Sequence, residues 1–240
     1  MNDSNAEAHL LLARIALDRE QYSSASGCLE EALSHDFSIG KRPVFHIIKA
    51  KVFEKKGELL AAKEVLEKAL LSYKKTETDL HHSSRNSPSF QADNVSLHIQ
   101  LSRVYSQLYN SSKATSILTE ALKTYKGTCH EVRLLVANSE LSITSGDFDG
   151  AIKVLNNIST DSPSFAQAQM VKANVYLTHR RDKILYAKCF EELVTLSPTS
   201  DSYIRLGEAY LRIQNHQDAI EAFSRALKLN PSDYKVRLHY

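Results

Sequence analysis

The sequence is poor in glycine and proline, with 7 and 5 among its 240 residues, and this excludes a sandwich or barrel built from many tight turns. It has no run of about 18 apolar residues, so we expect no membrane-spanning helix. Lys and Arg number 30 against 28 Asp and Glu, a net charge of +2. So balanced a charge does not favour nucleic acid or an anionic membrane as the main partner.

Cysteine is also scarce. Cys28, Cys129 and Cys189 are far apart, and no pair has zinc-binding or redox spacing. Cys28 and Cys189 stand beside apolar neighbours in helical patterns, which predicts two small buried side chains. The N-terminus, residues 1–7, has no basic region of the kind that opens a secretory signal. These features favour a reducing, cytoplasmic compartment.

The motifs of common catalytic and metal sites are missing. Glycine-rich phosphate loops, HExxH, GxSxG and CxxC are all absent, and the ten histidines show no paired-ligand spacing. His81 and His82 are adjacent in a polar stretch, where solvated histidines are a simpler interpretation than a metal site. We therefore predict no catalytic residue, no metal, no cofactor and no small-molecule substrate, and we expect that the chain is not an enzyme.

What the sequence does contain is an internal repeat, clearest from Ser200 to Asp233. This stretch reads Leu-Gly-x-x-Tyr from Leu206, then Ala-x-x-x-Phe-x-x-Ala from Ala219, and ends near Pro231. That is the tetratricopeptide pattern of two antiparallel helices. Small residues let the helices approach, large apolar residues fill the space between helix pairs, and proline ends the unit.

The same pattern recurs upstream at a nearly constant period. Small or apolar residues matching Ala226 stand at Ala32, Ala69, Ala121, Ile158 and Leu193, and successive members are 33 to 37 residues apart except for one gap of 52. The predicted repeats cover about 6–39, 43–73, 95–126, 131–163, 166–199 and 200–233, the fifth with one extra residue near His179 to Asp182. We therefore predict an all-α, right-handed α-solenoid of about six repeats.

Two stretches fall outside these repeats. Residues 74–94 are polar and Ser-rich, without a helical apolar face, and we predict a mobile loop inserted between the second and third repeats. Residues 234–240 read as the start of a further repeat. Since no polar capping helix follows them, we expect the chain to be an internal section of a longer array.

Positive charge is concentrated in one segment. Residues 41–75 hold ten Lys or Arg and four Glu, an excess of six positive charges. This segment is a candidate for docking an acidic partner or a phosphate-rich surface, although few aromatic residues are interleaved to stack bases. The alternative is an ordinary solvated face of the repeat.

Three stretches resemble a particular family. Residues 2–13, the run THRRDKILYAKCFEELVTLSP (178–198) and residues 202–233 are similar to an internal part of the tetratricopeptide repeat protein 21 family. The resemblance implies a section of the tetratricopeptide subunit of intraflagellar transport complex A. It further implies a non-catalytic scaffold in retrograde ciliary transport and cilium assembly, with other complex A subunits as partners and a location in cytoplasm and cilium.

A second hypothesis is a tetratricopeptide peptide-binding adaptor or co-chaperone outside cilia. Such adaptors hold a carboxylate in a basic clamp on the inward helix faces. The inward candidates of the fifth and sixth repeats are Gln167, Met170, Asn174, Leu177, Asp201, Ile204, Glu208 and Leu211. They are mixed and partly acidic, which disfavours a carboxylate clamp and favours packing against a helix or another solenoid.

Overall fold

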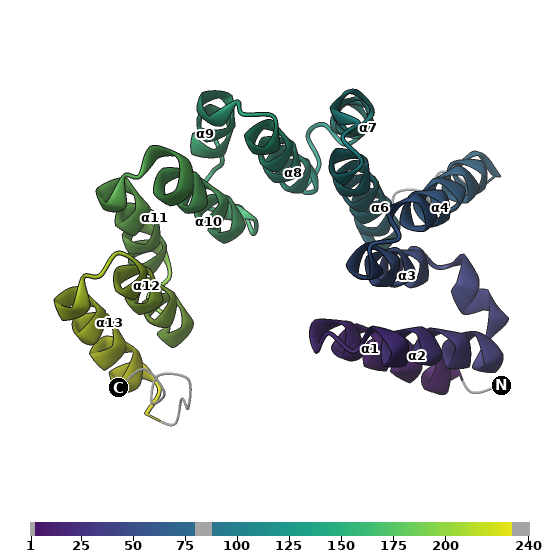
Figure 1. Ribbon diagram of the computed structural model, residues 1–240, viewed down its shortest axis with the longest axis horizontal. Helices are drawn as coiled ribbons and strands as arrows, with labels where there is room; N and C mark the ends of the chain where they lie inside the picture. Colours follow the sequence, from purple (N-terminus) through teal and green to yellow (C-terminus); the bar gives the residue numbers. More distant parts are fainter. Residues whose placement is uncertain (1–2, 80–87, 232–240) are drawn as a thin grey trace. The chain divides into compact units, whose positions relative to one another are not determined.

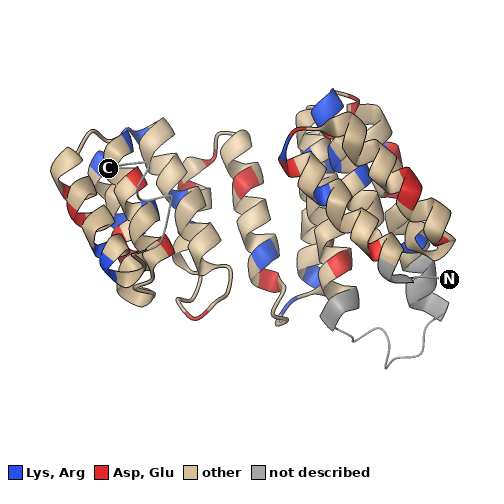
Figure 2. Ribbon diagram, turned by 90° about the horizontal axis from the view of Figure 1, so that it is seen from below, with Lys and Arg blue, Asp and Glu red and all other residues tan. Residues whose placement is uncertain are grey.

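The computed structural model describes residues 3–79 and 88–231, and all regular elements in these ranges are helices (Figure 1). The predicted all-α fold is therefore confirmed. The chain divides into two compact units, Met1–Leu134 and Leu135–Tyr240. Acidic and basic residues are interspersed along the helices of both units (Figure 2).

The first unit is a stack of helix pairs. Its elements are α1 (Asp3–Asp18), α2 (Tyr22–His35), the 3-10 helix η1 (Phe37–Lys41), α3 (Pro43–Lys56), α4 (Leu59–Asp79), α6 (Pro88–Gln107) and α7 (Ser111–Thr124). The helices pair as α1 with α2, α3 with α4 and α6 with α7. The first helices also contact one another, α1 with α3 and α3 with α6, so they form a continuous row.

The second unit is also built of successive helices that pack on one another. Helix α8 (Glu131–Thr144) begins just before this unit and continues into it. The other elements are α9 (Phe148–Asn156), α10 (Phe165–Val175), the π-helical turn η2 (Tyr176–Arg180), α11 (Lys183–Leu196), α12 (Ser200–Arg212) and α13 (His216–Leu229). Here α10 packs on α11, α11 on α12, and α12 on α13. Each hairpin therefore contacts its neighbour through its second helix.

The hairpin turns share one backbone feature. Each turn between a first and a second helix contains one residue with a positive φ: Glu20, Gly57, Tyr109, Gly146, Arg181 and Gln214. Each of these residues stands 12 positions before the member of the Ala226 series in the same repeat. Only two of the six are glycine, although non-glycine residues adopt this conformation at a cost of about 1 kcal/mol or more. The turn geometry is therefore common to all six hairpins, whereas the turn residue is not.

Side-chain caps mark the start of the second helices. Asp147 Oδ1 accepts a hydrogen bond from the Gly150 amide at 2.9 Å. Asn110 Oδ1 accepts one from the Lys113 amide at 3.2 Å, and Asn215 Oδ1 one from the Asp218 amide at 3.5 Å. These caps satisfy backbone N–H groups that have no partner inside the helix. In these three hairpins the polar residue after the left-handed turn thus starts the next helix, whereas Gln21 before α2 forms no side-chain cap.

The prediction of a polar loop over 74–94 is wrong at both ends. Helix α4 continues to Asp79, and α6 begins at Pro88. Asn94 is 3% exposed, so the end of the predicted loop lies in the core. Lys and Glu are good helix formers, and proline is favoured in the first turn of a helix, so a polar stretch without an apolar face can still be helical. The rest of the predicted loop, residues 80–87, and the predicted repeat start at 234–240 lie outside the described residues.

The extra residue of the fifth repeat is accommodated before the turn. Residues Tyr176–Arg180 form a π-helical turn that extends α10, and Arg181 then adopts φ 53°. Asp182 Oδ1 accepts hydrogen bonds from the amides of Ile184 at 3.0 Å and Leu185 at 2.9 Å, which starts α11. A one-residue insertion in a helix commonly forms such a π turn, because the backbone hydrogen bonds are then retained.

The core consists of small residues at the helix crossings and large apolar residues between hairpins. In the Ala226 series five members are buried, whereas Leu193 is half-buried beside the buried Val194. At the crossing of α12 and α13, a Cβ atom added to Gly207 would lie 2.6 Å from Cε1 of Phe223, whose side chain is 2% exposed. Gly207 is therefore required by close approach rather than by backbone conformation.

The three cysteines differ in environment. Cys189 is buried, as predicted, and burial raises the pKa of its thiol to about 11. Cys28 is only half-buried and packs on the edge of the core of the first hairpin, while Cys129 is exposed. Cys189 therefore serves as a small core side chain.

The crossing of α12 and α13 can be tested with two glycines. We expect Gly207→Ala to lower the free energy of unfolding by about 1–3 kcal/mol, because its methyl group would overlap the buried Phe223 ring. The matched control is Gly27→Ala in α2, where no heavy atom lies within 4 Å of the added Cβ. We expect this change to raise the stability by about 0.5–1 kcal/mol, as for alanine in an open helix. Urea denaturation measures both, and equal effects would contradict the close approach.

Candidate functional site

The predicted partner-binding residues lie on the first helices of the fifth and sixth hairpins. Gln167, Met170 and Asn174 are on α10 and Leu177 follows in η2, while Asp201, Ile204, Glu208 and Leu211 are on α12. The polar members and Met170 are exposed. Leu177 and Leu211 are half-buried and pack on core clusters. Of the predicted residues, the polar members and Met170 are therefore accessible to a partner, whereas Leu177 and Leu211 are only partly accessible.

On α12 the exposed row shares Asp201 and Glu208 with the predicted row, but it has Arg205 and Arg212 in place of Ile204 and Leu211. Ile204 is 4% exposed and packs with Ala219 and Phe223, so it is unavailable to a partner. The solvent-facing row of this helix is instead Asp201, Arg205, Glu208 and Arg212. Its spacing of four, three and four residues follows one face of an α-helix as well as the predicted row does. Arg205 and Arg212 were missed because periodicity alone does not distinguish these two neighbouring rows.

Three predicted residues, Met170, Asn174 and Glu208, line one open groove between α10 and α12. The groove has a volume of about 250 Å³, and its other lining residues are Tyr186, Phe190, Arg205, Ala209 and Arg212. The rings of Tyr186 and Phe190, on α11, meet edge to face with centroids 5.2 Å apart. The groove thus combines an aromatic pair with charges of both signs.

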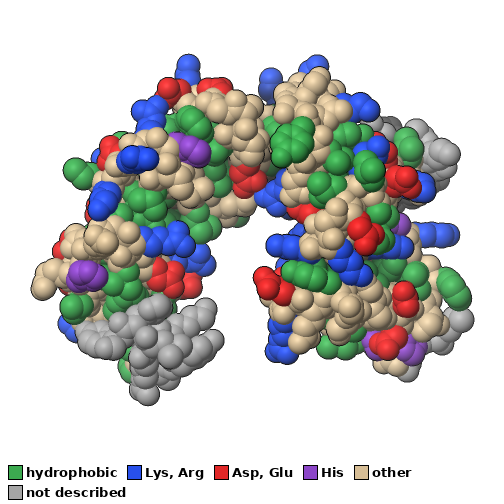
Figure 3. Space-filling model, viewed as in Figure 1, with side chains coloured by type: hydrophobic (Ala, Val, Ile, Leu, Met, Phe, Trp, Pro, Cys, Tyr) green, Lys and Arg blue, Asp and Glu red, His purple; other side chains and the backbone are tan. Residues whose placement is uncertain are grey.

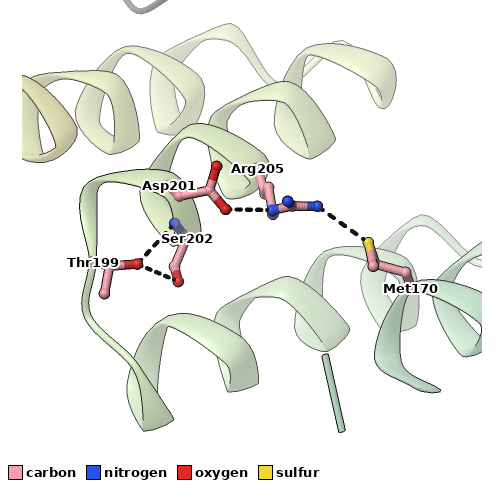
Figure 4. Close-up of polar contacts among 5 residues, drawn as sticks. All are labelled: Met170, Thr199, Asp201, Ser202 and Arg205. Carbon is pink, nitrogen blue, oxygen red and sulfur yellow. Dashed lines mark hydrogen bonds and ion pairs between the residues drawn. The ribbon is translucent and has the colours of Figure 1, made fainter. Parts of the chain in front are cut away.

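Polar contacts hold the α12 side of this groove (Figure 4). Arg205 donates from Nε to Asp201 Oδ2 at 2.8 Å, and its Nη1 reaches Met170 Sδ at 3.3 Å (Figure 4). Thr199 Oγ1 accepts from the Ser202 amide at 3.3 Å and thereby caps α12. Arg205 consequently spans the groove from α12 to α10.

The side chains behind the groove join α11 to both neighbouring helices. Gln169 donates to Glu192 Oε2 at 2.7 Å, and the Lys172 ammonium lies 3.7 Å from the same oxygen. Tyr210 donates to Glu191 at 2.8 Å, and burial together with this carboxylate raises the pKa of its hydroxyl. These contacts fix the spacing of α10, α11 and α12, so the groove is formed before any partner arrives.

The arrangement is suited to recognition. Along α12 the charges alternate from Asp201 to Arg212, and such a row complements a partner surface with the opposite alternation. In the ranges that the structure describes, no cluster of three or more His, Cys, Asp or Glu side chains is placed to hold a metal ion. None of the described helices is long and apolar enough to span a bilayer.

Two family models match the chain. The model described as the tetratricopeptide repeat protein 21 ARM repeat matches residues 37–193. The general tetratricopeptide repeat model matches residues 200–233, the stretch in which the repeat is clearest.

The chain is also similar to curated proteins along nearly its whole length. It is 35% identical to human tetratricopeptide repeat protein 21B over 97% of this chain, and 34% identical to the mouse protein over 96%. The Caenorhabditis elegans tetratricopeptide repeat protein 21 homolog is 28% identical over 98%. In each case the chain spans 18% of the relative's length.

Solved structures share the fold at low sequence identity. The apo form of RapI superimposes with a TM-score of 0.58 and 14% identity, covering 96% of this chain and 85% of RapI. A human IFIT1 dimer gives a TM-score of 0.53 and 17% identity, covering 97% of this chain and 56% of that chain. Together with the repeat matches, these similarities confirm the predicted α-solenoid class.

The exposed row on α12 predicts opposite behaviour for two adjacent residues. We expect Ile204→Ala to lower the free energy of unfolding by about 2–5 kcal/mol, because it leaves a cavity in the core. Arg205→Ala should cost only about 0–1 kcal/mol, as for an exposed ion pair. Urea denaturation of both variants shows which of the two side chains faces the core. A larger loss of unfolding free energy for Arg205→Ala than for Ile204→Ala would contradict the exposed row described above.

Proposed function

The chain belongs to the tetratricopeptide repeat protein 21 family, and we propose that it is a section of the tetratricopeptide subunit of intraflagellar transport complex A. In this proposal it is a non-catalytic scaffold that binds other complex A subunits and supports retrograde transport in cilia. The cytoplasm and the cilium are then its locations. The family match over residues 37–193 carries the proposal.

The groove between α10 and α12 is the proposed contact with a partner subunit. It is lined by Arg205, Arg212 and Glu208 together with the apolar Met170 and the Phe190 ring. An interface of this kind gains orientation from paired charges and affinity from the apolar centre. A helix or a second solenoid with matching charges would fill it better than a free carboxylate, because the Glu208 carboxylate also lines the groove.

The proposal is tested in ciliated cells that lack the endogenous protein. The full-length protein is expressed with Arg205→Glu and Arg212→Glu, which reverse both basic charges of the groove. We expect recovery of complex A subunits with the tagged protein to fall about tenfold, the effect of losing roughly 1.4 kcal/mol of binding. Transport material should then accumulate in the cilia, because its return is slowed.

A matched control carries the same change of charge outside the groove. Lys153 on α9 and Lys188 on α11 are exposed in the same unit, so Lys153→Glu with Lys188→Glu should leave recovery and ciliary traffic unchanged. If the groove variant recovers complex A subunits as well as the parent does, the groove between α10 and α12 is not the contact with a partner subunit. Absence of complex A subunits from the parent preparation would contradict the proposed function itself and favour an adaptor outside cilia.

A further inference from the structure

A second groove lies in the first unit, on its row of first helices. It has a volume of about 340 Å³ and is open to solvent. Its lining residues are Leu17, Asp18 and Glu20 at the end of α1, Lys51, Glu54 and Lys55 on α3, and Gln100 and Arg103 on α6. Three successive hairpins therefore contribute to one concave surface.

The basic side chains of this groove come from two neighbouring helices. Lys51 and Lys55 are exposed one turn apart on α3, and Arg103 faces the groove from α6. Within the described part of the chain, no carboxylate lies within ion-pair distance of either lysine ammonium. Figure 3 shows Lys and Arg side chains gathered where α3 lies against α1. Part of the positive excess of residues 41–75 is thus directed into a groove.

Glu54 is the carboxylate nearest to these lysines in sequence, and amide donors already occupy both of its oxygens. Gln100 donates to Glu54 Oε2 at 2.6 Å, and Gln107 donates to Oε1 at 2.5 Å. These bonds join α3 to α6 and hold Glu54 in place. Lys51 and Lys55, which form no ion pair with Glu54 or with another carboxylate of the described residues, keep their hydrogen-bonding capacity for a ligand.

The other two carboxylates lie at the opposite end of the groove. Asp18 is the last residue of α1, and Glu20 is the left-handed residue of the following turn. Two of the three carboxylates that line the groove thus belong to the end of α1 and its turn, whereas the three basic side chains belong to α3 and α6, where Glu54 is the one lining carboxylate. A continuous run of phosphates would meet the acidic end, and no aromatic side chain lines the groove to stack a base.

We propose that this groove binds a short acidic segment of a protein partner, whose carboxylates contact Lys51, Lys55 and Arg103. The acidic part of the segment lies across α3 and α6, the first helices of the second and third hairpins. Uncharged or basic residues that flank this part contact the end of the groove near Asp18 and Glu20. Charge complementarity of this kind steers association and fixes the orientation of the segment. The site is separate from the groove between α10 and α12, so it does not depend on the complex A proposal.

The test uses the 240-residue chain and a fluorescent hexaglutamate peptide, with hexaglutamine as the uncharged probe. Fluorescence anisotropy should show binding of hexaglutamate that weakens with added salt, and no binding of hexaglutamine. Lys51→Gln with Lys55→Gln should weaken binding about tenfold, since two exposed charge contacts are lost. Circular dichroism of each variant shows that the helices are retained.

Two further variants make the result specific to the groove. Lys63→Gln with Lys123→Gln removes the same charge from the second helices α4 and α7, and binding should stay within about twofold of the parent. Asp18→Asn with Glu20→Gln removes the repelling carboxylates and should tighten hexaglutamate binding several-fold. Equal losses for the two lysine pairs would overturn the proposal, because attraction by net charge alone would then explain the binding. So would binding of oligouridylate that is tighter than that of hexaglutamate and equally sensitive to Lys51 and Lys55, which would indicate a nucleic-acid site.

Discussion

Each hairpin reverses at a single residue in the left-handed conformation, and the second helix of the pair is positioned by that turn. In all six repeats the member of the Ala226 series, which lies on the second helix, follows the left-handed residue 12 positions later. With 3.6 residues per helical turn, a fixed offset places that residue on the same side of every second helix. Small residues at this point, such as Ala32 and Ala226, allow the close approach on which the stacking of the hairpins depends.

The same geometry determines which surfaces remain available for binding. The second helices contact the next hairpin in both units, as α11 contacts α12, and in the first unit the first helices also contact one another. The first helices keep one face toward solvent, and in each unit that face lines a groove with charges of both signs. Hydrogen bonds such as those of Glu54 and Glu192 join neighbouring helices beside the grooves. The grooves are therefore formed by the stacking of the repeat, and their specificity resides in the exposed side chains.

The sequence predicts the repeat well because the period is long-range and redundant. The Ala226 series and the tetratricopeptide pattern near Ser200 are sufficient for the all-α fold, and the family matches agree with the resemblance found in residues 2–13, 178–198 and 202–233. Local composition is a weaker guide. The polarity of residues 74–94 favours a loop, whereas the helical structure of residues 74–79 and 88–94 depends on backbone propensity and on the packing of residues such as Asn94.

The site is harder to predict than the fold for a geometric reason. Ile204 and Arg205 are neighbours on α12, about 100° apart around the helix axis. Which of them faces the core depends on the packing against α13, and the sequence pattern does not contain that angle. The sequence pattern indicates a candidate row that is mixed and partly acidic, but it does not identify Arg205 and Arg212. The basic excess of residues 41–75 was noticed, whereas its convergence with Arg103 requires the contact between α3 and α6.

The central claim is that partners bind the exposed faces of the first helices. Hydrogen–deuterium exchange of the full-length protein, alone and within purified complex A, tests this claim most directly. The account predicts slower exchange on partner binding in peptides from α10 and α12, and little change in α11 and α13. Slower exchange confined to the second helices, with α10 and α12 unchanged, would contradict it.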